Sequence, residues 1–124
     1  MDFIFDTHAH YDDHCFDDFR DELLSEIGQK GVGYIINNAT NLTDSAKACL
    51  EMSEKYDFCY TAVGIHPEAV ETEQVTLDEE LFNTLLSHKK TVAVGEIGLD
   101  YHYSADNKEL QKKVFSRPCE IAVE

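Results

Sequence analysis

The sequence predicts an α/β protein with a parallel sheet, because short strand-like segments alternate with segments of helical period. Four runs rich in β-branched and aromatic residues are typical of strands: residues 3–7, 32–37, 58–65 and 91–97. In the last run, residues 92–94 are apolar without alternation, which favours a strand covered on both faces. A helical segment follows each run, so the chain contains about four β-α units.

The first helical segment is amphipathic and has acidic residues at its start. The apolar residues at helical spacing are Phe16, Phe19, Leu23 and Ile27. The acidic residues of the opening turns, where the helix dipole favours negative charge, are Asp17, Asp18, Asp21 and Glu22. Gly28 and Gly31 are expected to end this helix.

The other three helical segments also carry start signals or apolar stripes. The second spans residues 43–56 with Thr43 as its expected N-cap, and the third opens on the capping-box pattern Thr76-Leu-Asp-Glu79. The fourth begins at about Asn107 and contains Pro118, which removes an amide donor at a cost of about 3 kcal/mol or more. The apolar residues that align in these segments are Ala46, Cys49 and Leu50, then Leu77, Leu81 and Leu85, then Leu110, Val114 and Ile121.

Composition limits the classes of function. The 25 acidic and 10 basic residues give a formal net charge of −15, which argues against a bare nucleic-acid-binding module. The four cysteines form no C-x-x-C pair and are typical of free thiols in a reducing compartment. No run of apolar residues approaches the ~18 residues of a membrane span, so we expect a cytoplasmic protein with no membrane partner.

Metal-capable side chains follow three of the four predicted strands. The first strand runs into His8 and His10, the third into His66, and the fourth into Glu96. Ligands bind at the carboxyl ends of parallel strands, so these side chains are expected to converge. Strand alternation places His8 and His10 on one side, about 6.6 Å apart along the strand, within reach of one ion.

Three motifs in the same order, "FDTHAHYDD", "GIHPE" and "AVGEIGLDYHY", resemble those of the TatD-related deoxyribonucleases, and the resemblance spans essentially all 124 residues. These are metal-dependent hydrolases of the amidohydrolase-like TIM-barrel group. The resemblance implies a (β/α)8 barrel, of which this chain would be the first half. Residues 1–124 are then the N-terminal portion of one hydrolase domain, truncated within the fourth helix.

The resemblance also implies a site with divalent cations, two in the complete protein, taken from Mg²⁺, Mn²⁺ or Zn²⁺. His8 and His10 would bind one ion, and Glu96 would bridge both as a metal ligand and catalytic residue. His66 would contact the substrate, DNA, whose phosphodiester bonds a metal-activated water would hydrolyse. We also assign Asp100 and Tyr101 to substrate binding.

Each assignment has a structural alternative. Glu96 could be a strand-end carboxylate paired with a lysine, and His66 part of an ordinary His-Pro turn. Asp6 could orient a histidine or the strand end instead of binding metal. Asp100 and Tyr101 could form an ordinary surface loop. The residues interpreted as a solvated helix start are Asp12, Asp13, Asp17 and Asp18, and those interpreted as surface histidines are His14, His88 and His102.

Two other functions compete with the nuclease. The first is a related amidohydrolase-like enzyme that acts on amide or ester bonds. The second is an inactive, truncated product, because the two later histidines and the aspartate that complete the site in the family are absent. A half-barrel would expose two sheet edges, which predicts self-association or binding to a complementary half. We expect the 124-residue chain alone to be inactive or nearly so, and the coding sequence to continue past Glu124.

Overall fold

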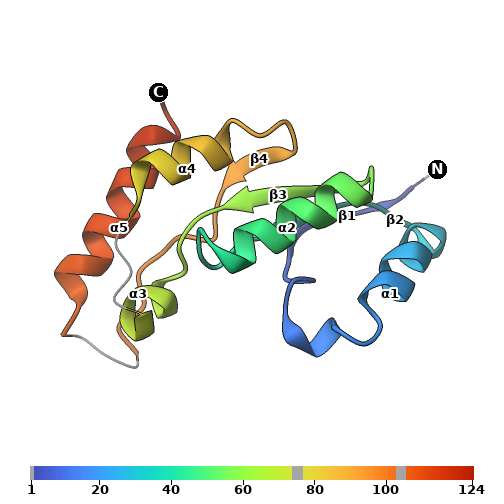
Figure 1. Ribbon diagram of the computed structural model, residues 1–124, viewed down its shortest axis with the longest axis horizontal. Coiled ribbons are helices and arrows are strands. Elements are labelled where there is room, and N and C mark those ends of the chain that lie inside the picture. Colours follow the sequence, from blue (N-terminus) through green and yellow to red (C-terminus); the bar gives the residue numbers. More distant parts are fainter. Residues whose placement is uncertain (1, 74–76, 103–105) are drawn as a thin grey trace.

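The computed structural model describes residues 2–73, 77–102 and 106–124, and it contains one parallel sheet. The strands are β1 (Ile4–Ala9), β2 (Val32–Asn38), β3 (Cys59–Val63) and β4 (Thr91–Val94), and they pair in the order β1-β2-β3-β4. All three neighbouring pairs are parallel, and Figure 1 shows the arrows of β3 and β4 running in the same direction. The predicted α/β class is therefore confirmed, and each predicted run overlaps one strand.

In the described part of the chain, five α-helices connect and flank the strands. They are α1 (Arg20–Ile27), α2 (Asp44–Lys55), α3 (Pro67–Glu73), α4 (Glu79–Leu86) and α5 (Lys108–Ile121). Two short 3₁₀ turns, at His14–Phe16 and Gly28–Lys30, lie before and after α1. The sequence patterns indicated four of these helices. Helix α3 is additional, and it begins with Pro67 at its first position, where a missing amide hydrogen costs nothing.

The predicted beginning of the first helix is wrong. Helix α1 begins at Arg20, so Asp17 and Asp18 precede it and do not lie in its first turn. The Arg20 side chain explains the change, because it donates to Asp17 Oδ1 at 2.7 Å and to the Asp13 carbonyl at 2.8 Å. These bonds hold the preceding segment as a turn. After the helix, Gly31 takes a left-handed conformation with φ 95°, as its role as a terminator requires.

At the start of α2 and of α4, the capping bonds come from residues other than the predicted ones. Thr43 occupies the predicted N-cap position of α2, but its side chain makes no cap bond. Instead, Asn41 Oδ1 accepts from the backbone N–H groups of Thr43 and Ser45 at 3.0 and 3.2 Å. At α4, Asp78 Oδ1 accepts from the backbone N–H of Leu81 at 3.0 Å. The N-cap of α4 is therefore Asp78. Thr76, the N-cap that the capping-box pattern predicts, lies outside the described residues.

Helix α5 continues through Pro118 to Ile121 without interruption. Its fully buried positions are Gln111, Val114 and Pro118, spaced three and four residues apart. The buried stripe shares Val114 with the predicted stripe, but its other members are Gln111 and Pro118 in place of Leu110 and Ile121. Leu110 and Ile121 are only partly buried at its border.

Two hydrophobic clusters hold the helices against the sheet. The first joins β1, β2 and β3 to α1 and α2 through Ala9, Leu24, Ile35, Ala39, Ala46, Cys49, Met52 and Cys59. The second joins β3 to α3, α4 and α5 through Leu42, Val63, Ile65, Val70, Phe82 and Val114. These buried residues fix the helix-covered side of the sheet, and they leave the carboxyl ends of the strands to polar side chains.

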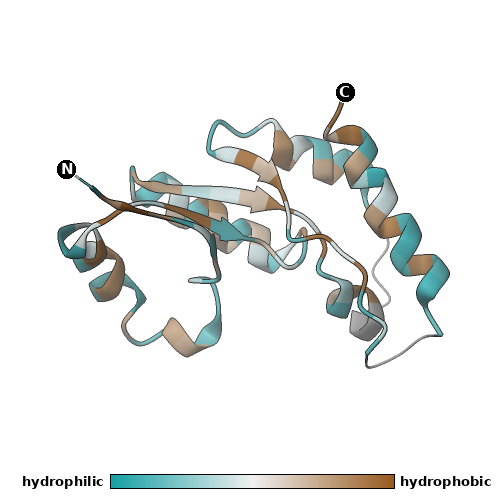
Figure 2. Ribbon diagram, turned by 180° about the vertical axis from the view of Figure 1, so that it is seen from behind, coloured by the Kyte–Doolittle hydropathy of each residue, from teal (hydrophilic) through white to brown (hydrophobic). Residues whose placement is uncertain are grey.

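The opposite face of the sheet is uncovered. When the molecule is seen from behind in Figure 2, the strands lie in front of α2 and no helix lies over them. Phe5 and Tyr34, whose rings lie 5.8 Å apart, are 53% and 42% exposed. Val92 is 51% exposed, so the prediction that the fourth strand is covered on both faces is wrong. Strand β4 lies at the edge of the sheet, beside β3 alone.

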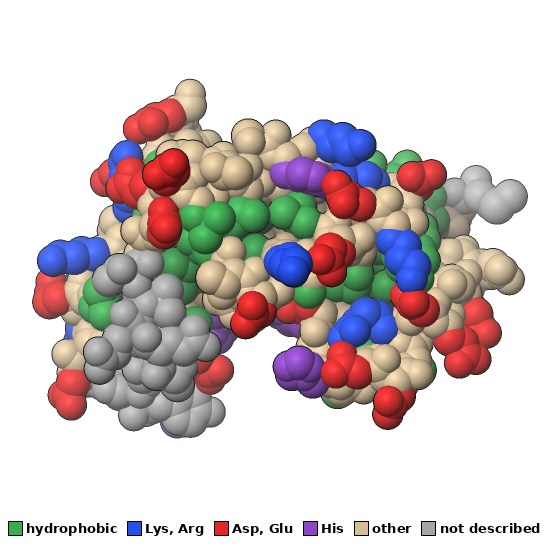
Figure 3. Space-filling view, in the orientation of Figure 1, with side chains coloured by type: hydrophobic (Ala, Val, Ile, Leu, Met, Phe, Trp, Pro, Cys, Tyr) green, Lys and Arg blue, Asp and Glu red, His purple; other side chains and the backbone are tan. Residues whose placement is uncertain are grey.

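The acidic residues are scattered over the helix-covered face shown in Figure 3 and do not form one patch. This distribution agrees with a net charge that serves solubility. No helix in the described part of the chain has both the length and the apolar character needed to cross a membrane.

The cysteines differ in accessibility, which predicts selective alkylation. Cys15 is exposed, while Cys49 and Cys59 are buried. Burial raises the pKa of Cys59 to about 11 and that of Cys49 further still, so neither forms the reactive thiolate at pH 8. We expect iodoacetamide at pH 8 to label Cys15 in the folded protein and to leave Cys49 and Cys59 unmodified. Peptide mass spectrometry checks this, with labelling in denaturant as the control. Equal rates at Cys15 and Cys49 in the folded protein would contradict this packing.

Candidate metal centre

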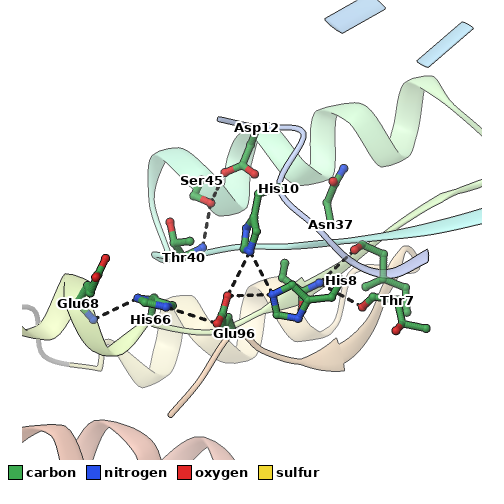
Figure 4. Close-up of polar contacts among 12 residues, drawn as sticks. Thr7, His8, His10, Asp12, Asn37, Thr40, Ser45, His66, Glu68 and Glu96 are labelled. Carbon is green, nitrogen blue, oxygen red and sulfur yellow. Dashed lines mark hydrogen bonds and ion pairs between the residues drawn. The ribbon is translucent and has the colours of Figure 1, made fainter. Parts of the chain in front are cut away.

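The end of β1 presents two histidines to the uncovered side of the sheet. Ala9, which lies between them, is 8% exposed and belongs to the core under the helices. Alternation along an extended chain therefore turns His8 and His10 the other way. Figure 4 shows both rings pointing toward Glu96, which comes from the segment after β4.

Three ligand atoms converge at this point. His8 Nε2 and His10 Nε2 lie 3.1 Å apart, and they lie 3.1 and 3.2 Å from Glu96 Oε2. This spacing is close to that of ligand atoms around one ion with bonds of about 2.0–2.1 Å. Among the residues that the structure describes, these three form the one cluster of histidine, cysteine or acidic side chains with such a geometry. Two imidazoles and a carboxylate form a donor set that suits a divalent cation.

His66 lies beside the same carboxylate but contacts its other oxygen. Its Nε2 lies 3.4 Å from Glu96 Oε1, and its Nδ1 accepts from the backbone N–H of Glu68 at 3.1 Å. Because Nδ1 is an acceptor, a neutral His66 carries its proton on Nε2 and can donate it toward Glu96. The ring is thus arranged as a hydrogen-bond donor facing the site.

The backbone of Glu96 is fixed by the two central strands. Gly95 donates its N–H to the Val63 carbonyl at 3.0 Å, and Glu96 donates to the Ala39 carbonyl at 3.1 Å. Gly64 lies so close to the backbone of Glu96 that a Cβ atom at position 64 would be 2.6 Å from the Glu96 carbonyl oxygen. Among the described residues, the ion pairs of Glu96 involve His8, His10 and His66, and the alternative of a lysine partner is not observed.

A cavity of about 650 Å³ opens beside these residues. Its lining residues are His10, Asp12, Asp13, His14, Thr40, Asn41, Asp44, Ser45, Ala48, His66, Glu68, Ala69 and Glu96. Five of these are acidic and none is lysine or arginine, so a polyanion would enter this cavity only with cations that offset the carboxylates.

Asp12 and Asp13 have structural partners in this wall. Ser45 donates its hydroxyl to Asp12 Oδ2 at 2.5 Å, so Asp12 is partly buried and the interpretation as a solvated helix start is wrong for it. Asp13 caps the first 3₁₀ turn by accepting from the Cys15 N–H at 2.7 Å, and this bond lowers the pKa of the Asp13 carboxyl. Neither contact is made to the histidine cluster.

The remaining candidates lie outside the cluster. Asp6 Oδ1 accepts from the backbone N–H of His8 at 3.1 Å, so Asp6 supports the strand end. On the segment after Glu96, Asp100 is partly buried and Tyr101 is exposed, and the structure places neither in the cavity lining. His14 and His88 pair with acidic residues elsewhere, at 3.1 Å from Asp17 and 3.2 Å from Glu54.

A buried glutamine that the sequence patterns did not indicate holds the segment after Glu96. Gln111 is 1% exposed, its Oε1 accepts from the Asp100 N–H at 2.8 Å, and its Nε2 donates to the Asp100 carbonyl at 2.7 Å. The available signal was a glutamine at helical spacing from Val114 and Pro118, since a polar residue in a buried stripe needs a partner.

Comparison with known proteins decides the family. The family model described as TatD related DNase matches residues 5–124. The chain belongs to the TatD-related DNase family. This membership confirms the resemblance in the three motifs.

Individual TatD relatives are similar over nearly the whole chain. The uncharacterized metal-dependent hydrolase YabD of Bacillus subtilis is 37% identical over 98% of this chain and 47% of its own length. The 3'-5' ssDNA/RNA exonuclease TatD of Cronobacter sakazakii is 28% identical over 98% of this chain and 45% of its own. The chain therefore spans less than half the length of these relatives.

A solved TatD structure confirms the fold. The crystal structure of YjjV, a TatD homologue from Escherichia coli K12, superimposes with a TM-score of 0.77 at 33% identity. The match covers 96% of this chain and 46% of that chain. The four β-α units thus correspond to about half of a TatD barrel.

Proposed function

We propose that this TatD-family chain supplies the metal-binding half of a hydrolase that cleaves phosphodiester bonds in DNA. The observation that carries the proposal is the convergence of His8 Nε2, His10 Nε2 and Glu96 Oε2 within 3.1–3.2 Å. Family membership supports a metal-dependent hydrolase. The relative named as a ssDNA/RNA exonuclease supports a nucleic-acid substrate.

In the proposed site, His8 and His10 would hold one cation through Nε2, together with Glu96 Oε2, which faces both rings. The other oxygen of Glu96, Oε1, faces His66, and it would be the oxygen through which Glu96 could hold a second cation. A bound divalent cation supplies activation of water and stabilisation of charge on phosphate oxygens. Imidazole ligands favour Zn²⁺ or Mn²⁺ over Mg²⁺ at the histidine position.

The neighbouring residues have proposed roles in substrate binding. His66 presents an Nε2–H donor beside Glu96, which suits a phosphate oxygen. Asp100 and Tyr101 would contact the substrate from the segment after β4, which Gln111 anchors. We also propose that the protein is cytoplasmic.

A second candidate is hydrolysis of an amide or ester by the same metal site. The described lining of the cavity contains no lysine or arginine, and this favours the second candidate. A substrate with few phosphates would not need positive side chains to offset its negative charge.

The test is hydrolysis by the complete protein that contains residues 1–124, measured on single-stranded DNA and on a panel of amides and esters. Mn²⁺, Mg²⁺ or Zn²⁺ is added, and EDTA is the control. DNA cleavage that EDTA abolishes supports the nuclease. Cleavage of amides or esters without DNA cleavage overturns it in favour of the second candidate, and no hydrolysis of any substrate contradicts both.

We further propose that residues 1–124 alone have little activity, since their site is open on the uncovered side of the sheet, where the His8 side chain is 54% exposed. EDTA-sensitive DNA cleavage by this chain would contradict that statement.

The uncovered face predicts self-association of the 124-residue chain. Phe5 and Tyr34 expose apolar surface beside the open β1 edge. We expect light scattering to give a mass above the 14.1 kDa of one chain at tens of micromolar. Phe5→Asp should shift the mass toward that of the monomer, whereas Val123→Asp, at a position 86% exposed near the end of the chain, should not. A monomeric mass at every concentration would contradict this prediction. A polypeptide that supplies the complementary half-barrel should bind the same face and therefore compete with self-association.

A further inference from the structure

Strand β2 is the strand whose end carries no metal-capable side chain, and it ends in two buried asparagines. Asn37 is fully buried and Asn38 is 6% exposed. Burying an amide costs free energy unless its polar atoms are hydrogen-bonded. The bonds that these two side chains make therefore indicate what they do.

Both asparagines bind the backbone of the histidine segment. Asn38 Nδ2 donates to the Thr7 carbonyl at 3.3 Å and to the Ile36 carbonyl at 3.1 Å. Asn37 Oδ1 accepts from the Tyr11 N–H at 3.2 Å. Thr7 immediately precedes His8, and Tyr11 immediately follows His10. The two amides thus hold the two ends of residues 7–11.

The strand ladder does not fix this segment by itself. The pairing of β1 with β2 shifts register between Asp6 and Ala9, where three steps along β1 oppose two steps from Ile35 to Asn37. Such an irregularity leaves backbone groups outside the ladder and bends the strand. The Thr7 carbonyl, within this interval, is bound by the Asn38 side chain.

We infer that Asn37 and Asn38 are positioning residues that hold His8 and His10 in their converged arrangement before a cation binds. This inference rests on the proposed metal site. The asparagines do not contact the ion. Instead, they act through the backbone on either side of its two imidazole ligands, and so reduce the ordering that binding requires.

The first test is Mn²⁺ affinity of the 124-residue chain, measured by titration calorimetry. Asn38→Ala and Asn37→Ala should each weaken binding by about 10–100-fold, as loss of a ligand-orienting partner does. The matched control is Ser53→Ala, which removes a buried hydroxyl that lies 2.7 Å from Thr61 Oγ1 and away from the histidines. It should lower stability to a similar degree and leave the affinity for Mn²⁺ within about twofold. Urea unfolding of each variant shows that it is folded.

The second readout needs no metal. In Asn37→Ala, the Tyr11 amide should lose protection from hydrogen exchange, whereas the Ala39 amide, which donates to the Ala62 carbonyl at 3.0 Å, should keep it. If the wild-type chain binds Mn²⁺ and both asparagine variants bind it equally well, the positioning role is wrong. If the wild type binds no Mn²⁺, the proposed metal site has failed. In that case, hydrogen exchange at the Tyr11 amide tests by itself whether Asn37 holds the backbone of the histidine segment. Unchanged protection of this amide in Asn37→Ala would overturn that role.

Discussion

Glu96→Gln is expected to weaken divalent-cation binding by roughly 100-fold or more and to abolish metal-dependent hydrolysis by the complete protein. Glu96 Oε2 lies 3.1 and 3.2 Å from the two histidine Nε2 atoms. The substitution removes the negative charge from this point and presents an amide there, although the shape of the side chain is kept. Calorimetric titration with Mn²⁺ and Zn²⁺ measures the loss.

The matched control for this experiment is Glu51→Gln. Glu51 is exposed on α2, and its partner Lys47 lies at 3.9 Å, so the same change of charge occurs away from the site. Its cation affinity should equal that of the wild type. A Glu96→Gln protein that binds Mn²⁺ and Zn²⁺ as tightly as the wild type would show that Glu96 is not a ligand.

Gly64→Ala is expected to have the second-largest effect, because it displaces Glu96 without touching its side chain. A Cβ atom at position 64 would lie 2.6 Å from the Glu96 carbonyl oxygen and 2.8 Å from the Gly95 carbonyl carbon. Both neighbours are backbone atoms, so the chain itself must move. We expect the free energy of unfolding to fall by about 1–3 kcal/mol and the affinity for Mn²⁺ to fall about tenfold.

The control for Gly64→Ala is Gly28→Ala. A Cβ atom at Gly28 would have no neighbour within 4 Å, and the φ of −64° there suits alanine. This variant should keep its cation affinity and its stability, or gain about 0.4–1 kcal/mol. Urea unfolding and calorimetry compare the two proteins. Equal behaviour of the Gly64 and Gly28 variants would contradict the close approach at Gly64.

The positions of the strands and of the candidate ligands could be predicted because they depend on local pattern and chain direction. Period-two and apolar runs indicate strands, and parallel strands bring their carboxyl ends together. His8, His10, His66 and Glu96 converge for this reason, although Glu96 lies 86 positions after His10 in the sequence. The alternation along β1 was sufficient to place both imidazoles on one side.

The helix ends and the coverage of β4 could not be predicted, since they depend on contacts made between distant segments. Arg20 reaches back to Asp17 and to the Asp13 carbonyl, and this delays the start of α1. Val92 follows the apolar pattern of a strand covered on both faces, yet it is exposed because the described helices cover one face of the sheet. An apolar pattern indicates that both faces of a strand can pack against other elements, but it does not indicate whether a helix is present to cover each face.

The residues that hold the site were the least visible in the sequence. Asn37 is the last residue of a predicted strand and Asn38 follows it, with no signal of a function in either, and Gln111 lies in a helix of ordinary composition. Their function depends on which backbone groups the fold leaves unpaired beside them, namely those of Thr7, Tyr11 and Asp100.

The central claim is that His8, His10 and Glu96 hold a divalent cation, and the most direct test is a crystal structure of the protein grown with Zn²⁺, with diffraction measured on both sides of the zinc absorption edge. We predict an anomalous peak within about 2.0–2.2 Å of His8 Nε2, His10 Nε2 and Glu96 Oε2. Zinc bound only elsewhere, such as between His14 and Asp17, or no zinc between these three side chains at saturating concentration, would contradict it.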